Sequence, residues 1–180
     1  SSGGLTVAGD GGGSSNGSGG SISNKTGNAV VLNNTRNVSL GYMSITNNSG
    51  SGVYGDDVTG FALTRSNVQS NSDALDGSEA NLRFLDLWGT CSISNSTISQ
   101  SPYDNIRISP TSGVLMLTIS NAVVGPTFGG SGNNGLTVAG SGTAAVNLTV
   151  SSNSQFTGNA GSGILTSFLD SSQQSITVQN

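Results

Sequence analysis

Three carboxylates lie close together in the segment SNSDALDGSE, residues 70–79, of a chain that otherwise carries little charge. Only 8% of its 180 residues are charged, and the formal net charge is −4. Carboxylate oxygens are ligands that suit Ca²⁺, and a pair of carboxylates can act as acid and base in glycoside hydrolysis. The segment therefore raises three alternatives, which are a metal site, a catalytic site and a polar turn.

The elements that would position these carboxylates follow from a repeat. Small residues followed by alternating apolar residues recur along the chain at intervals of 22 to 31 residues. The first apolar residues of these units are Leu5, Val30, Val53, Leu75, Ile106, Leu136 and Ile164. A single apolar anchor recurs between them, at Ile22, Ile45, Val68, Ile98, Val124 and Phe156. Short strands joined by Gly, Asn and Ser turns cannot each bury a face alone, so the units are expected to stack.

We predict an all-β fold, a parallel β-helix solenoid of about seven coils of 22–31 residues that forms a single domain over residues 1–180. The interval of about 76–106 is expected to be an enlarged coil that bears a loop. Strand edges without a capping element at either end indicate a segment of a longer repetitive chain. An antiparallel β-sandwich is the alternative, but it would require hairpin turns and strands of more even length.

The units ITNNSGSGVYG, VQSNSDALDG and FTGNAGSGIL resemble the right-handed parallel β-helix repeat family. That family includes pectate-lyase-like enzymes and bacterial surface and autotransporter passenger proteins. The resemblance covers nearly the whole chain and implies a right-handed solenoid with a ladder of stacked Asn side chains inside one turn. Asn48, Asn71 and Asn159 each follow an anchor by three residues and are the expected ladder. The resemblance does not specify a function, since the fold hosts lyases, hydrolases, adhesins and scaffolds.

The repeat register also predicts which polar residues are neighbours. It stacks Asp73 on Asp104 and places Tyr54, Asp76 and Arg107 in one outward column with a spacing of about 4.8 Å. One interpretation is an ion pair between Asp76 and Arg107, with the other carboxylates in solvated turns. A second is a Ca²⁺ site built from Asp73, Asp76 and Asp104, and a third is catalysis by the same carboxylates with Arg107. For polygalacturonase-like enzymes of this family, the resemblance implies a histidine beside the carboxylates. This chain contains no histidine, so it departs from that pattern.

Aromatic residues near this column are candidates for ligand binding. Trp88, Tyr103 and Tyr54 could stack on a sugar ring, and insertions in solenoids usually lie on the binding face. The alternative is that the loop around residues 84–88 folds back and covers apolar surface. Cys91, the only cysteine, is expected to be a buried and inert thiol.

Composition limits the classes of function. One Lys and four Arg cannot form the basic patch that nucleic acid requires, and no apolar run is long enough to span a bilayer. A Ser/Thr/Asn-rich surface indicates an extracellular or cell-surface protein. We expect a structural or adhesive module of a bacterial surface or secreted protein, whose partners are its own copies end to end or surface glycans. A polysaccharide lyase or glycoside hydrolase is the alternative, and Ca²⁺ is the one candidate cofactor.

Overall fold

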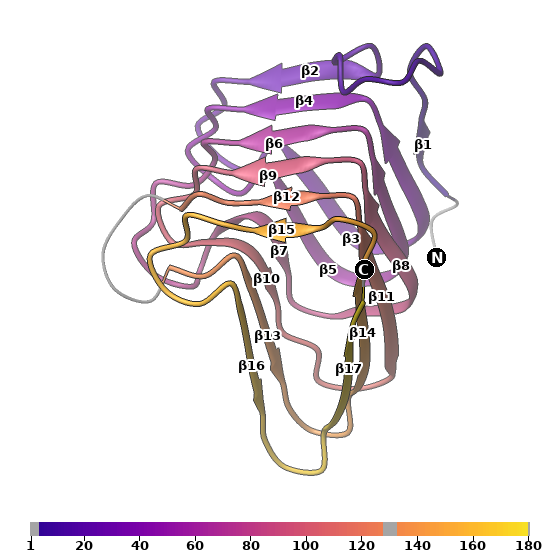
Figure 1. The fold of residues 1–180 in the computed structure, drawn as a ribbon, viewed down its shortest axis with the longest axis vertical. Helices are drawn as coiled ribbons and strands as arrows, with labels where there is room; N and C mark the ends of the chain where they lie inside the picture. Colours follow the sequence, from indigo (N-terminus) through magenta and orange to yellow (C-terminus); the bar gives the residue numbers. More distant parts are fainter. Residues whose placement is uncertain (1–3, 128–132, 180) are drawn as a thin grey trace.

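The computed structural model describes residues 4–127 and 133–179. The regular secondary structure in these ranges consists of β-strands alone, without a helix. The strands form two sheets of eleven and six strands, and all strand pairs are parallel. In Figure 1 the six strands of the smaller sheet run in the same direction, one above the other, from β2 to β15. The prediction of an all-β parallel β-helix is confirmed.

Each coil contributes strands to both sheets. The larger sheet contains β1 (Thr6–Val7), β3 (Val30–Gly41), β5 (Val53–Thr64), β7 (Ala80–Phe84), β8 (Leu87–Ser94), β10 (Asp104–Ile108), β11 (Val114–Ser120), β13 (Leu136–Gly140), β14 (Ala145–Ser151), β16 (Ile164–Phe168) and β17 (Gln173–Val178). The smaller sheet contains β2 (Gly20–Ser23), β4 (Met43–Thr46), β6 (Asn67–Gln69), β9 (Thr97–Ser99), β12 (Val123–Val124) and β15 (Gln155–Phe156). The long strands β3 and β5 cover a length that later coils divide between two strands, so β5 pairs with both β7 and β8.

Four coils, which begin with β3, β5, β7 and β10, have every strand paired on both sides. The expected number of about seven coils was therefore too high. Toward the N-terminus, β1 pairs through two residues with β3 only. In the coil of β13 and β14, the strand β15 lies at the edge of the smaller sheet, and β16 and β17 lie at the edges of the larger one.

The core consists of inward columns in which each side chain lies on the equivalent residue of the next coil. The anchors from Ile22 to Phe156 form one such column, because their strands pair with these residues opposite one another. Phe61, Cys91, Leu117 and Leu148 belong to another column of the larger sheet. These columns explain why the apolar positions recur with the period of the coil.

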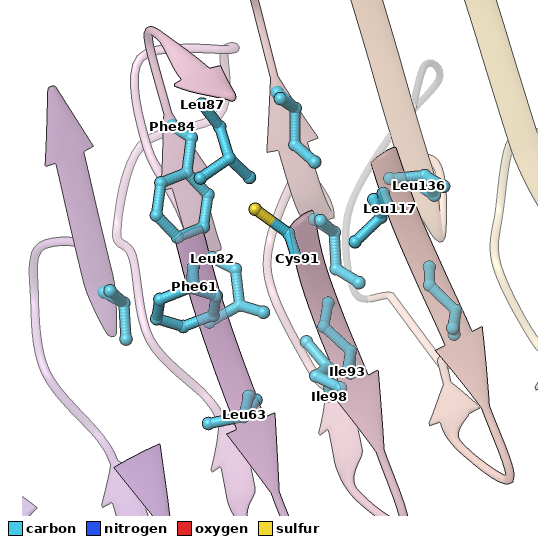
Figure 2. Packing of buried hydrophobic residues seen from close by; sticks show 14 of the residues in the cluster. Phe61, Leu63, Leu82, Phe84, Leu87, Cys91, Ile93, Ile98, Leu117 and Leu136 are labelled. Atoms are coloured by element: carbon cyan, nitrogen blue, oxygen red, sulfur yellow. The ribbon is translucent and has the colours of Figure 1, made fainter. Parts of the chain in front are cut away.

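Two aromatic rings pack against each other in the core. Phe61 and Phe84 pack edge to face with their ring centroids 4.9 Å apart (Figure 2). Gly55 is the strand partner of Phe84, and a methyl group added to Gly55 would lie 2.3 Å from Cδ1 of that ring. A glycine in β5 thus makes room for the largest side chain of β7.

Left-handed residues turn the chain at the ends of the strands. Asn24, Asn47, Ser70 and Gln100 directly follow β2, β4, β6 and β9, and all have positive φ. Tyr42, Arg65, Asn95, Asn121 and Ser152 occupy the same place after β3, β5, β8, β11 and β14. Asn tolerates the left-handed region better than most residues. The corners therefore account for part of the high Asn content of the chain.

The register differs from the predicted one at two units. Val53 pairs with Leu82, and Leu82 with Ile106, so the inward position expected for Leu75 belongs to Leu82. Leu75 is 73% exposed, in the segment between β6 and β7. Leu5 precedes β1, whose residues pair with the second half of β3 rather than with its start at Val30. The extra residues of the repeat consequently lie at 70–79, before β7, and overlap the predicted enlarged coil of about 76–106 only at its start.

Cys91 faces the core and is 1% exposed (Figure 2). Burial raises the pKa of its thiol from 9.0 to about 11. We expect no reaction with an aromatic disulfide reagent near pH 8 in the native protein and complete reaction in urea. Because the pKa is higher in the folded state, this thiol favours folding below pH 9, and its contribution is lost as the pH rises from about 9 to about 11. Rapid labelling of the native protein would contradict the placement of Cys91.

Candidate functional site

The carboxylates of segment 70–79 bind the backbone of their own loop. Asp76 Oδ1 accepts hydrogen bonds from the backbone nitrogen and the hydroxyl of Ser78. Glu79 Oε2 accepts hydrogen bonds from the backbone nitrogens of Asp73 and Ala74, at 3.3 and 3.4 Å. The hydrogen bonds from Ser78 lower the pKa of Asp76, and the charge of Arg107 lowers it by a smaller amount. Two of the three carboxylates thus shape a turn.

The neighbours predicted for these carboxylates are not the observed ones. Arg107 pairs with Arg83, which occupies the place expected for Asp76. Asp104 pairs with Ala80, so Asp73 does not stack on it. The reason is the register, because moving the inward position from Leu75 to Leu82 removes Asp73 and Asp76 from the sheet and leaves them in the loop.

The observed outward column consists of Tyr54, Arg83, Arg107 and Thr137, on β5, β7, β10 and β13. Segment 70–79 contacts this column, since a methyl group added to Gly77 would lie 2.7 Å from Cζ of Arg107. We call Tyr54, Arg83 and Arg107 the arginine column. It brings two of the five cationic residues of the chain onto adjacent strands.

Asp104 is completely buried and fully engaged by its neighbours. Its Oδ2 accepts a hydrogen bond from Nη1 of Arg107 at 2.8 Å, the one ion pair within the described ranges. Its Oδ1 accepts two hydrogen bonds from Asn134, from the backbone nitrogen at 2.9 Å and from Nδ2 at 3.0 Å. Such a carboxylate holds β10 against the following coil, and its oxygens are already used.

Arg83 is buried without a carboxylate. Its side chain lies on the outward column, yet the residue is only 8% exposed. Nη1 donates to the carbonyl of Phe84 at 2.7 Å and to the hydroxyl of Ser109 at 3.2 Å, whereas Nε has no partner. Burial lowers the pKa of Arg83 and the charge of Arg107 lowers it further, whereas Tyr54 and the charge of Asp104 raise it by smaller amounts. The guanidinium nevertheless remains protonated, as arginine does in proteins.

The three aromatic candidates do not form one surface. Tyr54 is the strand neighbour of Arg83. Trp88 lies on β8, where its Nε1 donates to the hydroxyl of Thr59, and a methyl group added to Gly113 would lie 2.8 Å from its Cε3. Tyr103 is half-buried just before β10. Trp88 therefore packs on a strand, and the segment 84–88 that was expected to be a loop contains the end of β7 and the start of β8.

A ladder of buried amides runs along the inside of the solenoid. Nδ2 of each residue donates to Oδ1 of the next in the order Asn48, Asn71, Asn81, Asn105 and Asn159, at 2.6, 2.8, 2.9 and 3.3 Å. Each Nδ2 also donates to a backbone carbonyl. Three of these five residues were expected, and Asn81 and Asn105 continue the ladder between Asn71 and Asn159.

The predicted metal ligands are not clustered. Within the described residues, no three Asp, Glu, Cys or His side chains lie close enough together to hold a metal ion. The same part of the chain contains no helix that is long and apolar enough to cross a membrane.

Replacing Asp104 by alanine should lower the free energy of unfolding by about 3 kcal/mol, because it removes the buried carboxylate that pairs with Arg107 and accepts hydrogen bonds from the backbone nitrogen and Nδ2 of Asn134. Urea denaturation of this variant measures the change. Asp76→Ala is the matched control in the exposed loop and should change the value by less than about 0.5 kcal/mol. Equal effects of the two substitutions would show that Asp104 is not the buried acceptor.

Comparisons with protein-family models, with curated proteins and with solved structures found no match. The fold and the arginine column are therefore the basis for assigning a function.

Proposed function

We propose that this chain is a structural and adhesive β-helix module of an extracellular protein, either secreted or on a bacterial surface. The observation that carries the proposal is the unbroken stacking of the coils. Interior columns, the amide ladder and the backbone pairs of both sheets all continue from one coil to the next. A solenoid of this kind is stiff along its axis and presents its outer faces to partners.

The outer surface supports an adhesive role in the same proposal. The outward residues Ser92, Thr118 and Thr149 lie opposite one another on neighbouring strands and are typical of a small, polar and nearly uncharged face. The arginine column differs from this face, because it places two arginines on adjacent strands. The partners in this proposal are surface glycans or further copies of the chain, and kinship with the β-helix proteins of bacterial surfaces belongs to the proposal as well.

The alternative, a polysaccharide lyase or glycoside hydrolase, receives little support from the geometry. Asp104 is buried and accepts three hydrogen bonds, and Asp76 is engaged by Ser78 in the loop. Asp104 thus serves the sheet and Asp76 the turn, and both carboxylates accept hydrogen bonds from the protein's own donors. Binding without bond cleavage is the simpler role for this surface.

A panel of immobilised polysaccharides, both acidic and neutral, tests the proposal. Retention of the protein is measured on each polysaccharide, and the same samples are assayed for new reducing ends and for unsaturated sugars. We expect retention on some members of the panel and no cleavage of any. Cleavage would overturn the proposal in favour of the enzyme, and a lack of retention together with a lack of self-association would contradict the adhesive role.

A further inference from the structure

Only one of the two guanidinium groups of the arginine column forms an ion pair within the described ranges. Asp104 neutralises Arg107, and its second oxygen is taken by Asn134. Arg83 has no carboxylate within ion-pair distance in the described ranges. The remaining residues, 1–3, 128–132 and 180, include no Asp or Glu. A buried arginine therefore stands beside a second arginine, and no acidic side chain of the chain pairs with it.

This arrangement is costly for the protein alone. A buried charge is normally paired and hydrogen-bonded, and two neighbouring cations repel each other. Nε of Arg83 and Nε of Arg107 are both buried without a partner. Guanidinium N–H groups form a planar fork that matches the oxygens of a carboxylate, sulfate or phosphate, so an oxyanion would satisfy free donors and reduce the repulsion.

We infer that the arginine column is a binding site for the oxyanion group, carboxylate or sulfate, of an acidic saccharide. Tyr54 is the next residue in the column, about 4.8 Å from Arg83, and offers an aromatic face and a hydroxyl to a sugar ring. Free inorganic anions would make use of the arginines but not of the tyrosine. The column therefore suits a charged sugar better than a bare ion.

The access to the site runs past Arg107. Its side chain is 25% exposed, whereas Arg83 lies deeper. Gly77 lies against the Arg107 guanidinium, and the exposed Asp76 of the same loop is near enough for the two charges to interact. Asp76 opposes an incoming anion, so Asp76→Asn should tighten binding. This inference rests on the proposed adhesive function and names its ligand class.

Sodium sulfate and sodium acetate are the first probes. Thermal unfolding of the full chain is followed as each salt is added at constant ionic strength. Sulfate stabilises proteins in general, so the comparison of variants decides the result. Arg83→Met removes the buried charge, and Arg36→Met removes a matched charge from an exposed position on β3. We expect the unfolding temperature of Arg36→Met to rise with the anion as in the natural sequence, and that of Arg83→Met to rise less.

Removal of an unpaired buried cation should leave Arg83→Met as stable as the natural sequence, or more stable, when no anion is present. Should this variant fail to fold, the unaltered protein provides the test. The Nε–H signals of Arg83 and Arg107 in its nuclear magnetic resonance spectrum should shift with sulfate and reach saturation, while that of Arg36 should not. Equal anion responses of the two variants, or shifts that do not saturate, would overturn the inference.

Polymers separate the ligand classes. Dextran sulfate, hyaluronan and neutral dextran are each tested for retention of the natural sequence, Arg83→Met and Tyr54→Ala. We expect retention on a charged polymer that falls in both variants, and sulfate or carboxylate is identified by which polymer retains the protein. Retention that both variants preserve would overturn the inference and leave the adhesive proposal intact. If the protein responds to the anions but is retained on neither charged polymer, a saccharide is excluded as the ligand. If it neither responds to the anions nor is retained, the binding site itself is excluded.

Discussion

Replacing Leu82 by alanine should lower the free energy of unfolding by about 3 kcal/mol, whereas Leu75→Ala should change it by less than about 0.5 kcal/mol. Leu82 is fully buried between Val53 and Ile106, and truncation leaves a cavity among fixed neighbours. Leu75 is 73% exposed. The same substitution at two leucines seven residues apart is therefore expected to cost much unfolding free energy at one position and little at the other.

Urea denaturation followed by the fluorescence of Trp88, the single tryptophan, measures both variants. The pair is its own control, because both substitutions remove the same atoms. A large effect at Leu75 with a small one at Leu82 would show that the solenoid passes through residue 75, and the arginine column would then not exist.

Asn81→Ala should cost about 3 kcal/mol of unfolding free energy, because the amide lies in the middle of the ladder. Oδ1 of Asn81 accepts from the backbone nitrogen and Nδ2 of Asn71, at 3.1 and 2.8 Å. Its Nδ2 donates to the carbonyl of Ser99 at 2.7 Å and to Oδ1 of Asn105 at 2.9 Å. Alanine removes these four buried hydrogen bonds and leaves the backbone nitrogen of Asn71 without its acceptor, so the desolvation of that group is no longer compensated.

Asn147→Ala on β14 is the matched control, since that side chain is exposed on the outer face of the sheet. Under the same denaturation conditions, the free energies of unfolding of the two variants should differ by most of the loss predicted for Asn81→Ala. Equal stabilities would mean that the ladder does not contribute to folding. Amide hydrogen exchange at Asn71 and Ser101 should also accelerate in Asn81→Ala if the ladder closes the turn.

Much of the fold follows from positions that repeat with one residue type. The anchors Ile45, Val68 and Ile98 were identified because each is a single apolar residue between polar turns, so no neighbouring residue competes for the inward position. The packing of Phe84 over Gly55 could not be predicted, since it depends on which strand of the next coil lies opposite Gly55.

The register error has a physical explanation. Leu75 lies 22 residues after Val53, as the preceding units suggest, whereas Leu82 lies 29 residues after it. Spacing favoured Leu75, but Asp76 and Glu79, which follow it, accept hydrogen bonds from backbone nitrogens of the loop and stabilise a turn there. The clustered carboxylates were thus a signal for an excursion from the solenoid, and they were interpreted as a site.

The candidate site was predictable only in part. Tyr54, Asp104 and Arg107 were identified from their residue types, and Arg83 was missed as their neighbour because the register was displaced. Asn81 and Asn105 were missed for a related reason, since they lie at the starts of strands and not three residues after an anchor. A search for amides near every corner, without fixed spacing, would have found them.

A cross-linking experiment tests most directly that Tyr54, Arg83 and Arg107 share one column. Cysteines at equivalent positions of paired parallel strands lie about 4.8 Å apart, within the range for a disulfide. Under mild oxidation, the variant with Tyr54→Cys and Arg83→Cys should form an internal disulfide, and the variant with Tyr54→Cys and Asp76→Cys should not. Cys91 is buried and remains reduced in both. Cross-linking of the second pair in place of the first would contradict the register on which the fold and the anion site depend.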